Sequence, residues 1–86
     1  MANVVTFQDL IARFPEIEKT ERRAWNAWRI AEGQTEEQFP FDEYLESTTY
    51  YISEGSAYRQ TDFGDVRRWT GKGWGRKLSW EAYDNL

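Results

Sequence analysis

The spacing of the apolar residues changes at Thr48. Before this residue, apolar side chains recur three and four positions apart, which is the spacing of helices that bury one side. After it, short β-branched and aromatic runs are separated by glycine-containing turns, the pattern of an antiparallel β-meander. Because the two patterns follow one another, the sequence predicts an α+β fold, with N-terminal helices packed on a small C-terminal antiparallel β-meander of three to four strands. We expect a single domain over residues 1–86, with a helical part at about 6–47 and a sheet part at about 48–78.

The helical part divides at Pro15, which ends one helix and suits the first position of the next. The first helix is predicted to begin after Thr6, an N-cap residue. The second should run from about Glu16 to Glu32 and end at Gly33, because glycine accepts the left-handed backbone of a helix C-terminus. The inward line of this second helix holds Ile17, Glu21, Ala24, Trp28 and Ala31.

Trp28 is the largest side chain on that line, so we expect it to be buried. Its replacement by alanine should then cost about 3–5 kcal/mol of stability. A short third helix is predicted over about 40–47. Its inward side would carry Phe41, Tyr44 and Leu45, and its outward side Asp42, Glu43 and Glu46.

Four short runs in the second half have the composition of strands, at residues 48–52, 57–61, 66–70 and 74–78. The turns between them fall at residues 53–56, 62–65 and 71–73. The tail from Ser79 onward is compatible with one helical turn, from which Trp80 and Tyr83 would dock on the sheet.

Two absent residue types restrict the chemistry, since the chain has no Cys and no His. Disulfides, thiolate nucleophiles, zinc sites of the usual kind and imidazole catalysis are thereby excluded. No other catalytic constellation is present, so we expect a binding protein and not an enzyme, with no cofactor and no metal. The chain also lacks the apolar run of about 20 residues that spans a membrane, and a signal peptide. We therefore expect a soluble cytoplasmic protein without a membrane partner.

Charge is distributed unevenly along the chain, whose net charge is −4. Residues 30–65 hold nine acids and one base, Arg59, whereas residues 66–78 hold five bases and no acid. Each block is compatible with a merely solvated surface, and each is also a candidate contact surface.

The acidic block is the first candidate for partner binding. Carboxylates along a short helix can imitate a row of phosphates and engage a basic groove on another protein, and Phe39 would lie at the rim of such a face. The predicted partner-binding residues are Glu36, Glu37, Asp42, Glu43, Tyr44 and Glu46.

The basic block is the alternative binding patch, because aromatic residues interleaved with Arg and Lys can stack bases and contact phosphates. Its residues are Arg67, Arg68, Lys72, Trp74, Arg76 and Lys77. The acidic net charge repels a polyanion, which disfavours direct binding to nucleic acid.

Residues 61–74, Thr-Asp-Phe-Gly-Asp-Val-Arg-Arg-Trp-Thr-Gly-Lys-Gly-Trp, resemble a hairpin element of bacteriophage tail and virion proteins. That element reads roughly T-D-x-G-x-V-y-R-W-x-G-x-x-W, and Arg67 stands where an aromatic residue is usual. The resemblance covers 14 of the 86 residues and implies a phage or prophage origin. Small acidic phage proteins commonly inhibit host machinery, as anti-CRISPR, anti-restriction and polymerase-binding proteins do.

The sequence therefore suggests a small acidic phage-type protein in the host cytoplasm. It would bind and inhibit or modulate a host macromolecular machine, either a protein or a protein–nucleic acid complex. Two alternatives remain open: a structural virion or tail component or assembly factor, and a nucleic-acid-binding module that uses the basic patch. The identity of the partner and the oligomeric state also remain open.

Overall fold

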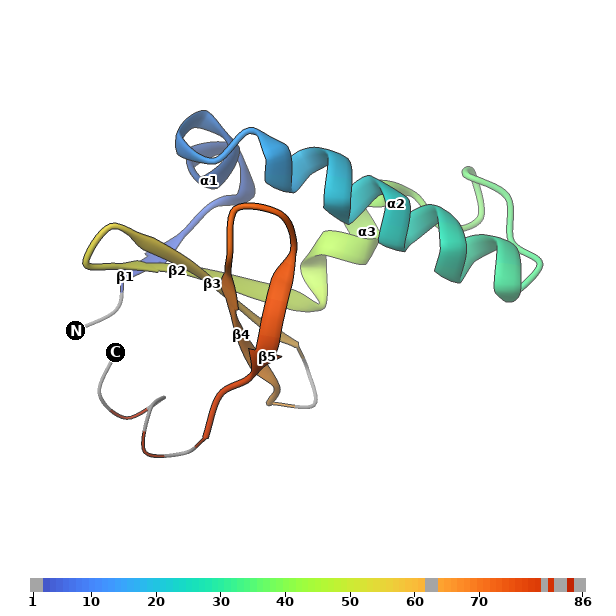
Figure 1. The fold of residues 1–86 in the computed structure, drawn as a ribbon. Coiled ribbons are helices and arrows are strands. Elements are labelled where there is room, and N and C mark those ends of the chain that lie inside the picture. The colour runs from blue at the N-terminus through green and yellow to red at the C-terminus, as the bar shows by residue number, and fades with distance from the viewer. Residues whose placement is uncertain (1–2, 62–63, 80, 82–83, 85–86) are drawn as a thin grey trace.

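The computed structural model describes residues 3–61, 64–79, 81 and 84. Within these described residues, three helices and five strands make up an α+β fold (Figure 1). The helices are α1 (Phe7–Arg13), α2 (Glu16–Ala31) and α3 (Phe41–Glu46). The strands are β1 (Asn3–Val5), β2 (Thr48–Ser53), β3 (Ser56–Thr61), β4 (Val66–Trp69) and β5 (Trp74–Lys77).

The sheet has the strand order β1-β2-β3-β4-β5, and every neighbouring pair is antiparallel. The meander from β2 to β5 has the order predicted from sequence, but the prediction of three to four strands was wrong because β1 adds a fifth. β1 is only three residues long, too short to show a two-residue period. It is a strand because Val5 pairs with Tyr50, a partner remote in sequence.

Local signals fixed the ends of the helices. The Thr6 hydroxyl accepts a hydrogen bond from the Asp9 backbone N–H at 3.1 Å, as expected of an N-cap. Gly33, with φ of 69°, follows the C-terminus of α2 in the left-handed conformation. α1 and α2 lie on one side of the sheet, and α2 continues past it, with α3 beneath (Figure 1).

The core forms between these helices and one face of the sheet. Its buried residues are Leu10, Ile17, Tyr50, Ile52, Ala57 and Trp69. Trp25 belongs to the buried set, with 6% of its surface exposed, whereas Trp28 is 48% exposed.

The expectation that Trp28 is buried was therefore wrong. The helical repeat places Trp25, and not Trp28, one turn beyond the buried Glu21. In addition, the C-terminal part of α2 extends beyond the sheet, so its inward line has no sheet to pack against (Figure 1). Trp25 is held at the α3 side, where its indole N–H donates to the Phe39 carbonyl at 2.8 Å.

The predicted docking of Trp80 and Tyr83 lies outside the described residues. In the part of the chain that is described, no helix is both long and apolar enough to cross a membrane.

Candidate functional site

A buried carboxylate, Glu21, joins α2 to the sheet. Only 1% of its surface is exposed. One oxygen, Oε2, accepts a hydrogen bond from the Tyr50 hydroxyl and another from Arg59 Nε at 3.0 Å. The other oxygen, Oε1, accepts from the Trp74 indole N–H at 2.9 Å. Both oxygens are thus engaged by donors from β2, β3 and β5, which fixes the position of α2 over the sheet.

The electrostatics of this cluster follow from its burial. Desolvation raises the pKa of Tyr50 far above its usual value, and the neighbouring Glu21 raises it further. The pKa of Tyr44 is raised for the same two reasons. Burial alone would lower the pKa of Arg59, but Glu21, Tyr44 and Tyr50 together outweigh this effect and the pKa rises. Arg59 Nη2 also donates to the Tyr44 hydroxyl at 3.1 Å, which links the cluster to α3.

Neither Glu21 nor Arg59 was predicted as a site residue, although both carried a signal. Glu21 lies on the apolar line of the second predicted helix, where a charged residue needs a buried partner. Arg59 is the one base among the nine acids of residues 30–65, and it stands on a strand. Pairing these two anomalies would have suggested the ion pair.

The outer side of α3 forms what we call the acidic ridge, made of Asp42, Glu43 and Glu46. Successive residues of an α-helix are rotated by about 100°, so these three occupy one continuous arc. All three are exposed. No ion pair joins any of them to a basic residue in the described part of the chain.

A groove lies on each side of α3. The first, the edge groove, has a volume of about 330 Å³ and is lined by residues 4–7, Asp42, Leu45, Glu46 and residues 48–50. The second, the aromatic groove, has a volume of about 320 Å³. It is lined by Ala24, Trp28, Tyr44, Ser47, Thr48, Arg59 and Thr61. The acidic ridge therefore lies between the edge groove and the aromatic groove.

The aromatic groove adjoins a partly exposed row of rings. The centroids of Trp28 and Phe39 lie 4.7 Å apart, and those of Phe39 and Tyr44 lie 6.4 Å apart. Phe39, which the sequence predicts at the rim of the acidic face, thus packs against Tyr44 of α3. Trp28 was missed as a surface residue because its helical position indicated the core.

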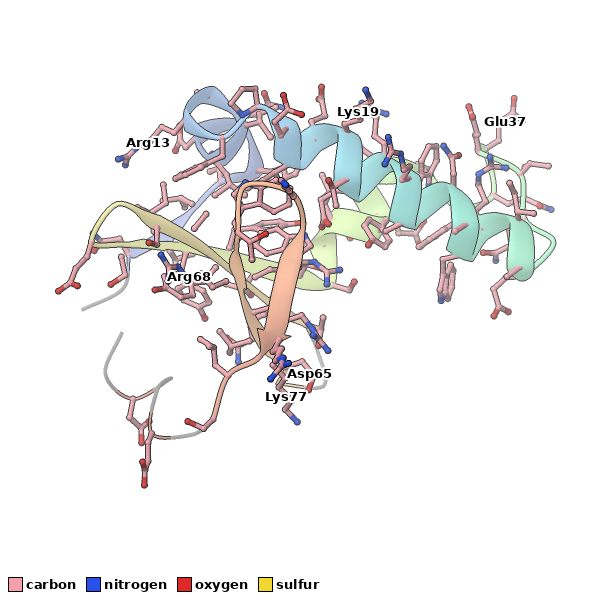
Figure 2. The ribbon with its side chains drawn as sticks, in the orientation of Figure 1. Arg13, Lys19, Glu37, Asp65, Arg68 and Lys77 are labelled. Carbon is pink, nitrogen blue, oxygen red and sulfur yellow. The ribbon has the colours of Figure 1, made fainter. Side chains whose placement is uncertain are left out.

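The other two predicted acids lie in the α2–α3 loop, where Glu36 and Glu37 are both exposed. Glu36 is 3.9 Å from Arg29 Nη2, a weak ion pair. Glu37 extends from the loop near the C-terminal half of α2 (Figure 2). These acids are separated from the ridge in sequence by Phe39, which contacts both Trp28 and Tyr44.

The structure gives the six residues of the predicted basic patch different roles. Trp74 donates its indole N–H to Glu21, and Arg67 Nη1 donates to the Gly75 carbonyl at 2.9 Å. Lys77 Nζ is 3.1 Å from Asp65, and these two side chains lie together at the end of β5 (Figure 2). The remaining residues, Arg68, Lys72 and Arg76, are exposed.

No family model, curated protein or solved structure matches the chain. The residues and their geometry are thus the basis for a functional proposal.

Proposed function

We propose that this chain is a protein-binding domain of phage type, which docks its acidic ridge on a basic surface of a host macromolecular machine and thereby modulates that machine. The observation that carries the proposal is the combination on α3: three exposed carboxylates without a described ion-pair partner stand between two grooves. A ridge of charge beside recesses can engage a partner by both electrostatic attraction and apolar burial.

The exposed aromatic side chain beside the ridge supports this function. Trp28 is 48% exposed although it is one of the largest apolar side chains, and it lines the aromatic groove with Tyr44. Residues of these two types contribute much of the affinity in many protein interfaces. The carboxylates would steer the encounter, while Trp28 would supply the buried anchor of the complex.

Direct binding of nucleic acid through the basic patch is supported less well. Its Trp74 has its indole N–H bonded to the buried Glu21 carboxylate, which restricts its use as a stacking platform. Two of its cations, Arg67 and Lys77, already have partners within the chain. Four exposed cations, of which Lys77 is already paired with Asp65, provide a weak electrostatic attraction for a polyanion on a chain with a net charge of −4.

The proposal is tested by capturing partners from host lysate on the immobilised protein and measuring the affinity of each candidate for charge-reversed variants. The ridge variant is Asp42→Lys/Glu43→Lys/Glu46→Lys. The matched control is Arg68→Glu/Lys72→Glu/Arg76→Glu, which reverses three exposed charges on the β4–β5 hairpin. Both variants should unfold at nearly the wild-type temperature, because exposed charges contribute little to stability.

We expect the ridge variant to lose at least about tenfold in affinity for the captured partner, while the control variant retains it. The opposite pattern, with the control variant impaired and the ridge variant unchanged, would move the interface to the basic patch. A homogeneous large assembly of the isolated protein in light scattering would instead favour a structural virion component.

A further inference from the structure

The sheet has an open edge beside α3. β1 pairs with Ile52, Tyr51 and Tyr50 of β2, and its register ends at Val5. β2 continues for two more residues, Thr49 and Thr48, which pair with β3 only. After Val5 the chain leaves the sheet and enters α1, so no described strand covers this end of β2.

The hairpin that joins β2 to β3 determines which backbone groups face this edge. Glu54 and Gly55 both have positive φ, at 50° and 79°, as in a two-residue hairpin turn. Ser53 and Ser56 are register partners that flank the turn, and residues in this position of a two-residue hairpin form a hydrogen-bonded pair. Along an antiparallel pair the bonding direction alternates, so the N–H and C=O of Thr48 face away from β3 and toward the open edge.

The edge groove lies at this position and combines apolar and acidic walls. Leu45, Phe7 and Tyr50 supply apolar surface, and each of them belongs to the core or packs against it. Asp42 and Glu46, one helical turn apart, bring two exposed carboxylates to the same groove. Val4, which is 68% exposed, lines it from β1. Among the described residues that line the groove, none is basic.

We propose that the edge groove receives an extended, basic segment of the partner protein, which adds to the uncovered end of β2. Its backbone would pair with Thr48, and an Arg or Lys side chain would lay its aliphatic stem on Leu45 and reach Asp42 and Glu46 with its charged end. Strand addition supplies main-chain hydrogen bonds, and adjoining pockets supply side-chain specificity. The inference rests on the proposed function, because Asp42 and Glu46 also belong to the acidic ridge.

The chemistry of the groove selects this occupant. Long cationic side chains combine an apolar stem with a charged head, which matches an apolar floor between two carboxylates. A guanidinium can donate two parallel hydrogen bonds to one carboxylate, and these charge-assisted bonds are stronger than neutral ones. An acidic segment would meet like charge at Asp42 and Glu46, and a purely apolar segment would leave both unpaired.

The test uses a capped peptide of alternating residues, acetyl-Val-Arg-Val-Arg-Val-amide, titrated into the isotope-labelled protein and followed by amide resonances in NMR. Saturable shifts centred on Thr48, Asp42 and Leu45 are expected. A peptide with Glu in place of Arg should not bind. Two further peptides carry N-methyl groups either on the valines or on the arginines. Because alternate residues of a strand direct their N–H groups to the same side, only one of the two should lose binding.

A matched pair of neutralised variants separates the groove from general electrostatic attraction. Asp42→Asn/Glu46→Gln should weaken peptide binding about tenfold, because both carboxylates of the groove are lost. Glu36→Gln/Glu37→Gln removes the same charge from the α2–α3 loop and should change it less than about twofold. Equal effects of the two double variants, or no saturable shift at Thr48, would overturn the inference.

These outcomes are distinguishable from failure of the proposed function. If the peptide does not bind the groove but the ridge variant still loses the captured partner, the ridge is the interface and strand addition is wrong. If the peptide binds as described but the captured partner binds the charge-reversed ridge variant with unchanged affinity, the proposed function fails. The groove is then a peptide-binding site with another role.

Discussion

Replacing the buried Glu21 by leucine should destabilise the domain severely. Leucine is of similar size, so the change removes the two acceptor oxygens without opening a large cavity. The side chain of Arg59 is only 17% exposed and would lose the carboxylate that balances its charge. The Tyr50 hydroxyl and the Trp74 indole N–H would lose the same acceptor.

The loss of one member of a buried ion pair costs about 3–5 kcal/mol, because the remaining charge stays desolvated. The whole stability expected of a domain of this size is about 4–13 kcal/mol. The Glu21→Leu variant should therefore lose from about a quarter to all of the stability of the domain, and it is unfolded at room temperature if the wild type lies at the lower end of this range. Urea denaturation followed by tryptophan fluorescence measures the effect, and Lys19→Ala, an exposed change on the same helix, is the control that should stay within about 0.5 kcal/mol of wild type.

A double variant keeps the test informative if the single variant does not fold. Glu21→Leu/Arg59→Met removes both charges, so the desolvated guanidinium no longer opposes folding. The double variant should be more stable than Glu21→Leu alone, with a coupling of about 0.5–3 kcal/mol in the double-mutant cycle. A Glu21→Leu variant that unfolds within about 1 kcal/mol of wild type, or a cycle with no coupling, would refute the structural role assigned to this pair.

Three further predictions concern stability. Trp25→Ala should cost about 3–5 kcal/mol of stability because Trp25 is buried. Trp28→Ala should cost less than about 2 kcal/mol because about half of the Trp28 surface is already exposed. Equal losses of stability in urea denaturation would contradict this difference. In the folded state the pKa of Tyr50 lies above its usual value of 10.0. The stability that the protonated Tyr50 hydroxyl contributes is therefore complete below pH about 10 and is lost as the pH rises toward the folded pKa. Stability should fall in alkaline solution, and a Tyr50→Phe variant should show a smaller fall. Gly55→Ala should cost about 1 kcal/mol because φ is 79° there, and an unchanged melting temperature would argue against the turn geometry.

The features predictable from sequence are those that local chemistry determines. The Thr6 cap, the end of α2 at Gly33 and the turn at Glu54–Gly55 each depend on a few neighbouring residues. The succession of β2 to β5 followed from short runs separated by glycine turns. The exposed arc of Asp42 and Glu46 followed from the helical repeat alone.

The features that sequence did not predict depend on contacts between remote segments. β1 is a strand because β2 provides its partner. Glu21 and Arg59 meet although they are 38 positions apart, which no local pattern encodes. Trp28 had the spacing of a core residue, and its exposure follows from the length of α2 relative to the sheet (Figure 1). The edge groove likewise exists because β1 ends at Val5 while β2 continues.

The most direct test of the acidic ridge as the interface is the association rate constant with the captured partner, measured between low and high salt. For the unmodified protein, we expect a rate constant that falls steeply as salt is added, because screening weakens the attraction between the ridge and a basic surface. The Asp42→Lys/Glu43→Lys/Glu46→Lys variant should associate at least about tenfold more slowly at low salt and show little salt dependence. An association rate that this variant leaves unchanged at every salt concentration would contradict the proposed function.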